Sequence, residues 1–366
     1  MRVNGISYRT IRPSDDGKAI EIIDQTRLPH EFVLARLETL EAAAHSIRHM
    51  RVRGAPLIGA TAAYGIALIM RQRPTDAALE GACQVLTRTR PTAVNLRWAL
   101  QRMQRVLAPL PAEARSGAAW REAQAICDED VAINRAIGEH GLRLLRPLAE
   151  KKGGPLDLMT HCNAGWLATV DYGTALAPVY LAQEAGIPPH VWVSETRPRN
   201  QGLLTAWELA QQGVPHTLVT DSACGHLMQR GQVDAVIVGA DRVTRRGDVA
   251  NKIGTYMKAL AARESGVPFY VAVPGPSIDW TLEDGVRDVP IEERSSDEVR
   301  QIAGKNHRGE LAALDVTPPG TPVANPAFDV TPAHLITALV TERGSCDASA
   351  AGLAALYPEF KPRTHP

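Results

Sequence analysis

The stretch AVIVGADRVTRRGDVANKIGTY, residues 235–256, decides the fold class. It opens with Ala235–Ala240, a short apolar run typical of a strand that is buried on both faces of a parallel sheet. Asp241 follows at once, so we expect its carboxyl group where the strand ends. A carboxyl group against an apolar wall has a raised pKa and can hold a proton near neutral pH. Asp241 is therefore a candidate general acid, although an Asp here can also cap a helix or pair with Arg242.

A helix is predicted after the polar loop of the same stretch. Gly247-Asp248 opens it, with Asp248 as N-cap, and the apolar residues that follow recur at helical spacing. Asn251 and Lys252 would then lie in the first turn, where free N–H groups, the helix dipole and the lysine favour an anion, most naturally phosphate. This pattern suggests an enzyme that acts on a phosphorylated small molecule. An ordinary strand–helix unit with solvated Asp and Lys side chains explains it equally well.

Outward from this stretch, the C-terminal half alternates between apolar runs and helical segments. The runs are 156–160, 191–194, 217–220, 235–239 and 269–273. This alternation predicts an α/β fold, a Rossmann-like doubly wound parallel sheet with helices on both faces. Ligands bind such sheets at the carboxyl ends of the strands, and polar residues follow several of the runs at that edge. No GxGxxG motif follows a strand, so a dinucleotide cofactor is not indicated.

Residues 1–150 are predicted to form a smaller α-rich domain that carries a short β-sheet. Pro56 suits the first turn of a helix, so Arg53 and Gly54 would lie just before a helix N-terminus, a second place where an anion would bind well. A basic residue that simply ends a loop is an equally common explanation. The β-prone runs are 6–11 and 19–23, and apolar spacing indicates helices around 33–47, 56–70, 96–107 and 118–137.

The segment KKGGP, residues 151–155, is the best candidate for a linker between domains. Residues 151–345 would then form the Rossmann-like catalytic domain. Its last helix is expected after residue 330, with Thr331 as N-cap and Pro332 in the first turn. Residues 346–366 are rich in Ala and Pro and are expected to form a peripheral tail.

The composition argues against several classes of protein. The chain has 366 residues with 40 basic and 40 acidic side chains, so no overall positive field favours a nucleic-acid partner. The N-terminal residues lack the apolar core of a signal peptide, and the most apolar stretch, 56–70, is too short to span a membrane. Five cysteines without a CxxC pair argue against a disulfide framework and a zinc site. We therefore expect a cytoplasmic protein that binds neither nucleic acid nor membrane.

Cys162 is the cysteine best placed for chemistry, because it follows a predicted strand in the segment HCNAG. A helix that begins close behind it would lower the thiol pKa and favour the thiolate. A free cysteine is more often a small buried hydrophobic residue, so position alone does not establish a role. A thiolate and a protonated Asp241 at neighbouring strand ends would form an acid–base pair that moves a proton between adjacent carbons. Such chemistry needs no metal ion and no redox cofactor.

Several longer segments, taken together and in order, resemble the methylthioribose-1-phosphate isomerases of the methionine salvage pathway. The same larger group contains ribose-1,5-bisphosphate isomerases and regulatory subunits of the eukaryotic translation-initiation guanine-nucleotide exchange factor. The segments lie between about residues 23 and 342 and are IDQTRLPHEF, RGAPLIGATAAYGIAL, RPTAVNLRWAL, THCNAGWLAT, ETRPRNQGLLTAWEL, GADRVTRRGDVANKIGTY, PIEERSSDEV and NPAFDVTPAHLIT.

The resemblance implies an aldose–ketose isomerase that converts 5-methylthioribose 1-phosphate to 5-methylthioribulose 1-phosphate, without a cofactor and as a homodimer. Carried over residue by residue, the family's catalytic pair falls on Cys162 and Asp241. Its substrate-binding positions fall on Arg53, Gly54, Ala55, Arg90, Gln201, Asn251 and Lys252.

The substrate's anomeric oxygen carries the phosphate ester, so the ring must open while the phosphate stays on C1. We expect Asp241 to protonate the ring oxygen and the Cys162 thiolate to carry the C2 proton to C1. A direct hydride shift from C2 to C1, with Asp241 handling the hydroxyl protons, is the competing route.

The sequence differs from the family pattern at two places, and two other functions compete with the predicted one. Leu203-Leu204 stands where many members have Ala-Arg, so a binding role of that Arg is absent here. The segments VPGPSIDW and DSACGHLM resemble a bacterial subgroup in which 5-deoxyribose 1-phosphate is an alternative substrate. A non-catalytic binding protein like the regulatory subunits is one rival, and a ribose-1,5-bisphosphate isomerase, which would need a second cationic pocket at C5, is the other.

Overall fold

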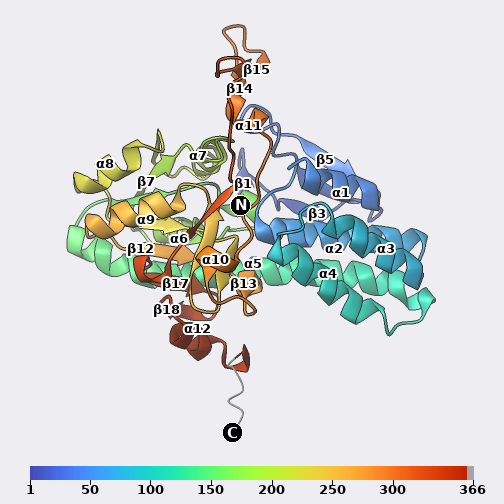
Figure 1. The fold of residues 1–366 in the computed structure, drawn as a ribbon. Coiled ribbons are helices and arrows are strands. Elements are labelled where there is room, and N and C mark those ends of the chain that lie inside the picture. Colours follow the sequence, from blue (N-terminus) through green and yellow to red (C-terminus); the bar gives the residue numbers. More distant parts are fainter. Residues whose placement is uncertain (361–366) are drawn as a thin grey trace.

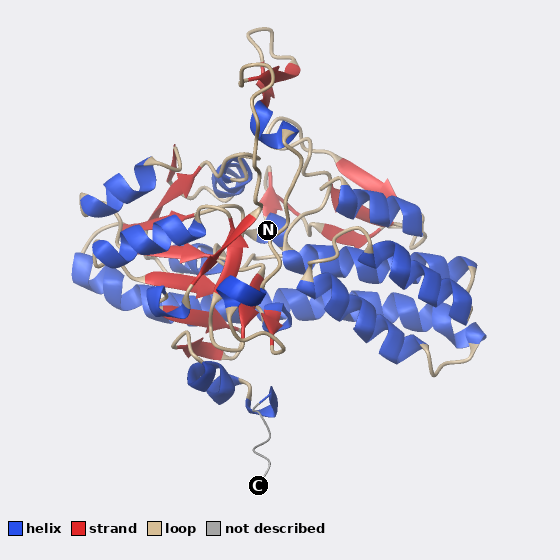
Figure 2. Cartoon of the chain, viewed as in Figure 1, coloured by secondary structure: helices blue, strands red, loops and turns tan. Residues whose placement is uncertain are grey.

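The computed structural model describes residues 1–360 and shows a helical region and a sheet region joined by one long helix (Figures 1 and 2). The sheet region is built on a seven-stranded sheet in the order β18-β17-β12-β9-β6-β7-β8, parallel except between β17 and β18. Five of these strands coincide with the five apolar runs, so the predicted α/β fold is confirmed. The strands are β6 Leu156–Thr160, β7 Pro189–Ser194, β8 His216–Val219, β9 Ala235–Val238, β12 Phe269–Ala272, β17 Ala338–Thr341 and β18 Gly344–Cys346.

Both faces of this sheet are buried, because side chains of a strand alternate between them. In β9, Ala235 and Ile237 belong to one hydrophobic cluster, and Val236 and Val238 belong to another on the opposite face. Only a run that is apolar throughout can fill both clusters. The first cluster is covered by α5 Ala112–Lys152, α6 Ala177–Glu184 and α7 Gly202–Gln211, the second by α8 Ala223–Gln229, α9 Thr255–Glu264 and α12 Ala350–Leu356.

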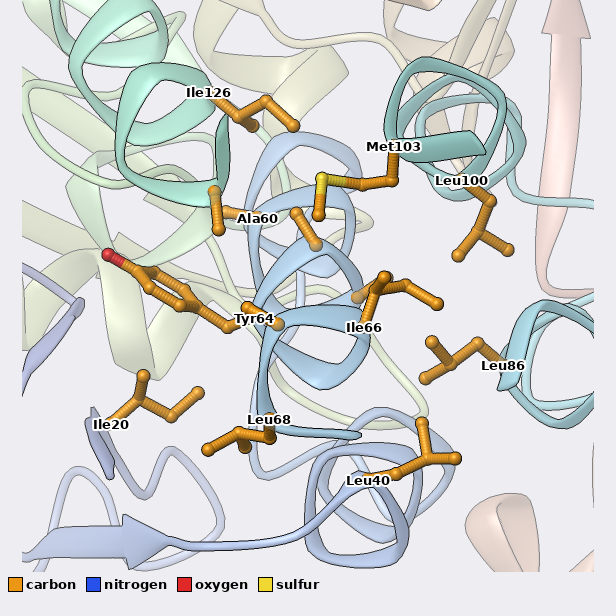
Figure 3. Packing of buried hydrophobic residues seen from close by; sticks show 14 of the residues in the cluster. Ile20, Leu40, Ala60, Tyr64, Ile66, Leu68, Leu86, Leu100, Met103 and Ile126 are labelled. Carbon is orange, nitrogen blue, oxygen red and sulfur yellow. The ribbon is translucent and has the colours of Figure 1, made fainter. Parts of the chain in front are cut away.

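The helical region packs around α2, Ala55–Gln72, which is buried along 15 of its 18 residues. A helix that is apolar on all sides must be surrounded, and Figure 3 shows Tyr64 and Ile66 of α2 among side chains from neighbouring elements. The helix predicted over 33–47 is half wrong, because residues 34–37 form a strand and Thr39 then caps a helix. The surrounding elements are α1 Leu40–Arg48, α3 Asp76–Thr87, α4 Val94–Leu107, α5, β3 Ile11–Pro13, β4 Ile20–Ile23 and β5 Leu34–Leu37, with β1 Arg2–Val3 and β2 Ile6–Ser7 apart.

The segment 151–155 ends a helix and does not act as an extended linker. Helix α5 packs against α2 in the helical region and against α6 in the sheet region, and continues to Lys152. Gly153 then takes a left-handed conformation, φ +67°, which stops the helix. The boundary expected at residue 150 therefore lies inside a continuous helix. The helix is longer at both ends than the one expected over 118–137. Its N-terminal half contributes buried residues to the core of the helical region, and its C-terminal half contributes to the core of the sheet region.

The helix predicted to begin at Asp248 is wrong. Val249–Lys252 is strand β11, which pairs with β10 on one side and β16 on the other, and α9 begins only at Thr255. The Asp248 carboxylate accepts hydrogen bonds from the N–H groups of Gly285 and Ala333, each at 2.9 Å. One partner of β11, strand β16, is about 80 residues away in the sequence, so local spacing could not reveal this pairing. The sheet has the order β13-β10-β11-β16, with β10 Arg242–Thr244, β13 Ile278–Asp279 and β16 Phe328–Thr331.

Two expectations for the C-terminal part are also corrected. Thr331 is the last residue of β16, and Pro332 leads into a single 3-10 turn, Ala333–Leu335, followed by β17. The tail is not peripheral over its described part, because Leu353 of α12 and Tyr357 are buried in the sheet region. Residues 361–366 of the tail lie outside the described residues. The remaining elements are α10 Gly285–Asp288, α11 Asp297–Arg300 and the hairpin of β14 Gln301–Lys305 and β15 Leu311–Asp315.

None of the helices in residues 1–360 combines the length and the hydropathy that crossing a membrane requires.

Candidate active site

One cleft of about 840 Å³ lies at the carboxyl ends of β6 and β9, where the N-terminus of α2 meets the sheet region. This is the edge at which parallel sheets bind ligands. The helical and sheet regions thus each contribute one wall. The cleft is lined by every residue that the sequence singled out for the site: Arg53, Gly54, Ala55, Arg90, Cys162, Gln201, Asp241, Asn251 and Lys252.

Asp241 lies just beyond the end of β9, as expected. Its backbone N–H donates to the carbonyl of Ala250 at 3.0 Å, which joins the end of β9 to strand β11. Desolvation by the surrounding protein raises the carboxyl pKa to about 6, although Arg90, Lys252 and Arg53 act in the opposite direction. At neutral pH a useful fraction of Asp241 is therefore protonated and able to donate a proton.

Cys162 follows β6 in a left-handed backbone conformation, φ +65°, which costs a residue other than glycine about 1–3 kcal/mol. Two hydrogen bonds hold it there: its N–H donates to Thr196 Oγ1 at 2.8 Å, and its carbonyl accepts from Thr205 Oγ1 at 2.8 Å. Sulfur thus reaches the cleft through a conformation that the surrounding structure enforces.

The expected helix behind Cys162 is absent, because Trp166–Ala168 is only a single 3-10 turn. Burial raises the pKa of the Cys162 thiol, and the nearby cations Arg53 and Lys252 offset this only in part. The thiol is therefore mainly neutral in the free protein, contrary to the expectation of a thiolate stabilised by a helix dipole.

Arg53 and Gly54 precede α2, as predicted. Gly54 has φ +85°, and a Cβ atom there would lie 2.2 Å from the carbonyl oxygen of Ala168, so only glycine fits. Arg53 Nη2 lies 3.5 Å from Asn163 Oδ1, next to the Cys162 loop. Burial lowers the pKa of the Arg53 guanidinium, but an arginine remains protonated near neutral pH.

Asn251 and Lys252 belong to β11 and reach the cleft from a strand. Asn251 Nδ2 donates to Thr255 Oγ1 at 3.0 Å, and this bond fixes the amide. Burial lowers the pKa of Lys252, while the neighbouring Cys162 and Asp241 favour its charged form. The proposed cation is thus present, but the free N–H groups of a helix first turn are not.

Arg90 and Gln201 each hold a buried polar atom without a protein partner among residues 1–360, Arg90 Nε and Gln201 Oε1. Buried polar atoms in proteins are nearly always hydrogen-bonded, so such atoms in a cleft suit a polar ligand. Arg90 also forms an ion pair with Glu292, Nη2 to Oε2, at 3.1 Å.

Sequence reasoning missed Arg199 and Arg294, which also line the cleft. Both pair with Glu298 Oε1, at 3.0 Å from Arg199 Nη1 and 2.7 Å from Arg294 Nη2. It also missed Glu208, which accepts a hydrogen bond from Asn163 Nδ2 at 3.0 Å beneath the Cys162 loop. Arg199 lies in a loop after a strand, a position that signals a site, whereas Arg294 and Glu208 carry no comparable local signal.

His161, next to Cys162, is a satisfied core residue. It is fully buried, its Nε2 donates to the carbonyl of Ile253 at 2.8 Å, and burial lowers its pKa, so the ring is neutral.

Comparison with known proteins shows which family this chain belongs to. A model of the initiation factor 2 subunit family matches residues 51–348. A methylthioribose-1-phosphate isomerase of Rhodospirillum rubrum is 62% identical, with 100% of this chain and 96% of the relative covered. One of Methylorubrum extorquens is also 62% identical, over 98% of this chain and 99% of the relative. The chain belongs to the methylthioribose-1-phosphate isomerase family.

Solved structures agree with this family fold. The crystal structure of 5-methylthioribose 1-phosphate isomerase from Pyrococcus horikoshii superposes with a TM-score of 0.82 at 39% identity, with 96% of each chain covered. A structure from A. fulgidus described as translation initiation factor eIF-2B subunit delta gives 0.80 at 40% identity, covering 96% of this chain and 100% of that one. The isomerase family thus shares its architecture with proteins described as translation factors.

Proposed function

We propose that this protein is an aldose–ketose isomerase that converts 5-methylthioribose 1-phosphate to 5-methylthioribulose 1-phosphate in methionine salvage. The observation that carries the proposal is the single cleft in which a carboxyl group with a pKa of about 6, a thiol and several basic side chains meet. A sugar phosphate needs all three kinds of group, and relatives with about 60% identity are named for this activity.

The substrate phosphate is bound by Arg53, Arg90 and Lys252. An arginine offers a planar fork of N–H groups that matches phosphate oxygens, and a buried lysine adds a point charge. The N-terminus of α2, which begins at Ala55, adds its dipole. Asn251 and Gln201 supply neutral hydrogen-bonding groups for the sugar hydroxyls.

Ring opening is assigned to Asp241. Its protonated carboxyl group donates to the ring oxygen as the bond from C1 to that oxygen breaks, and the electron pair stays on the oxygen. The carboxylate that results then accepts the proton of the C2 hydroxyl as the C2 carbonyl forms. Asp241 thereby returns to its starting state after each turnover.

Hydrogen reaches C1 from C2 either as a proton carried by Cys162 or as a hydride that moves directly. The first route needs Cys162 as thiolate while Asp241 is protonated. At pH 7 a carboxyl group with a pKa of about 6 is protonated in a minority of molecules, and burial raises the pKa of the Cys162 thiol, so the thiol is mainly neutral. Few molecules hold both groups in the states that the proton route needs, which favours the hydride route, with Cys162 against the reacting carbons as a neutral thiol.

Turnover in deuterium oxide separates the two routes. Deuterium at C1 of the product would require the proton route and Cys162 as base, and its absence would favour the hydride shift. Replacement Cys162→Ser is expected to lower kcat by about 10²–10⁴-fold if the thiol is the base. Near-normal turnover of the Cys162→Ser variant would show that Cys162 is not a catalytic residue.

A non-catalytic binding role is the second candidate, because a structure described as a translation-factor subunit is 40% identical. Purified protein mixed with 5-methylthioribose 1-phosphate decides between them. Formation of the ketose supports the isomerase, and binding without ketose supports the binding protein. The same assay with 5-deoxyribose 1-phosphate tests the alternative substrate.

We further propose that the protein acts in the cytoplasm as a homodimer. Five free cysteines suit a reducing compartment, and family resemblance supports the dimer. Sedimentation at micromolar concentration tests the dimer.

A further inference from the structure

The catalytic cleft continues into a second chamber, which opens to solvent and has a volume of about 1310 Å³ when the open part is included. The two spaces share Met50, Arg53, Arg199 and Gln201 along their junction. Figure 1 shows the hairpin of β14 and β15 at the top of the molecule, above α11. One apolar part of its wall comes from that hairpin, at Ala303, Gly304 and 311–313, and another comes from Leu28, Pro29, Leu203 and Leu204. Polar side chains complete the lining, among them Gln25, Thr26, His30, Asn200, Asp297, Glu298 and Gln301.

We infer the orientation of a bound sugar from the residues that line the catalytic cleft and do not line the second chamber. Arg90, Asp241 and Lys252 line the catalytic cleft but not the second chamber. A pentose whose C1 phosphate lies at Arg90 and Lys252, with Arg53 reaching it from the junction, extends its far end, C5, away from Arg90 and Lys252 and past Arg53. The 5-substituent then points into the second chamber.

The chamber suits an uncharged substituent. Arg199, the basic residue of the junction nearest Glu298, is paired with that carboxylate at 3.0 Å, and Glu298 binds Arg294 as well. A second phosphate would have to displace this pairing. The two leucines at 203 and 204 present hydrocarbon to the chamber.

We propose that this isomerase accepts 5-alkylthio substituents several carbons longer than methyl, housed between the hairpin and the 203–204 pair. The proposal rests on the isomerase function proposed above. A methylthio group fills only a small part of the second chamber, so added methylene groups displace water from apolar walls. Burial of each methylene group is worth up to about fourfold in affinity.

The test is a series of ribose 1-phosphates that carry 5-methylthio, 5-propylthio and 5-pentylthio groups. A kcat/KM that stays level or rises along the series supports the proposal. A kcat/KM that falls with each added methylene group overturns it, because the chamber then excludes the longer chain.

Two variants of the hairpin locate the effect. Ala312→Trp adds bulk to the chamber wall and should turn the level or rising series into a falling one. Leu314→Trp is the matched control, because Leu314 lies on the same strand, is 63% exposed and does not line the chamber. The same change in slope for both variants, or for neither, would overturn the assignment of this wall.

Failure of the proposed function gives a different result. If no sugar of the series is isomerised, the isomerase function is wrong. The shift in thermal unfolding temperature produced by the 5-pentylthio and 5-methylthio sugars then reports on the chamber alone. An equal or larger shift for the longer sugar supports the chamber, and a smaller shift overturns it.

Discussion

At the scale of single residues, the site depends on two residues in the left-handed backbone conformation, which most residue types disfavour. Cys162 has φ +65° and Gly54 has φ +85° on opposite walls of the cleft. Glycine adopts this region freely, whereas the cysteine is held there by Thr196 and Thr205. Strain held by surrounding bonds is common where a side chain must be aimed at a ligand. The sequence RGA indicates the glycine, but nothing local reveals the strained cysteine.

Asp241 should set the alkaline limb of the pH profile. A general acid works only in its protonated form, so kcat/KM should fall about tenfold per pH unit above the carboxyl pKa of about 6. Asp241→Asn should lower kcat by about 10²–10⁴-fold, and its residual activity should lack this limb. Titration of the substrate phosphate is common to both proteins, so a limb that persists unchanged in the variant would contradict the assignment.

Arg53 should contribute more than its charge. Arg53→Lys keeps a cation but loses the planar fork, and KM for the sugar phosphate should rise about tenfold or more while the fold is kept. Steady-state kinetics give KM, and circular dichroism provides the check on folding. Arg245→Lys, at an ion pair with Glu283 outside the cleft, is the matched control. An unchanged KM in Arg53→Lys would exclude Arg53 from phosphate binding.

At the scale of elements, strand β11 carries two residues of the cleft that were predicted to lie in the first turn of a helix. Asn251 and Lys252 belong to the site, but they arrive on a strand paired with β10 and β16. The apolar residues that suggested a helical core face are largely exposed in α9, with Met257 at 65% and Leu260 at 43%. The apolar spacing correctly predicted helix α9 but placed its start too early. Residues 249–252 pair with residues 328–331 and so form a strand, and the helix begins only at Thr255.

Helix α5 carries a buried acid that should make stability depend on pH. Asp130 accepts a hydrogen bond from the N–H of Val170 at 2.8 Å, and burial raises its pKa from 3.8 to about 7. Between these values the folded state holds a proton that the unfolded state has lost. Stability therefore falls as pH rises from about 4 to 7, by roughly 4 kcal/mol, and is level above that.

The variant Asp130→Asn keeps an acceptor for Val170 and removes the titration. Urea unfolding at pH 4.5 and 7.5 measures the effect, and the loss of stability between these values should be smaller in the variant. Equal losses in both proteins would show that Asp130 does not titrate as proposed.

At the scale of the whole molecule, the cleft exists only where the two regions meet. Arg53 and Arg90 come from the helical region, and Asp241 and Lys252 come from the sheet region. Helix α5 packs against both and holds their relative position. A ligand that contacts both walls must therefore stabilise the whole chain.

Product binding should raise the stability of the protein as one unit. At a free concentration about 100 times its Kd, 5-methylthioribulose 1-phosphate should add about 2.7 kcal/mol to the free energy of unfolding. Differential scanning calorimetry should show one transition that shifts upward, and Arg53→Lys should need more product for the same shift. Two transitions, of which only one moves, would contradict a site shared between the regions.

The sequence by itself determined the class of the fold and singled out nine residues that the structure places around one cleft. Short apolar runs that alternate with helical segments are typical of strands buried on both faces, and Asp241 follows one of them. Motifs such as RGA, HCNAG and GAD then indicated which polar residues matter, through resemblance to a family.

Only the tertiary structure decided how these residues meet. It replaced the helix at 248 by a strand, joined the regions through α5, buried part of the tail and brought Arg199 and Arg294 to the cleft. It also set the protonation of Cys162 and Asp241, because desolvation depends on everything packed around a group. Strand pairing, burial and charge are properties of residues far apart in the chain, which no local pattern encodes.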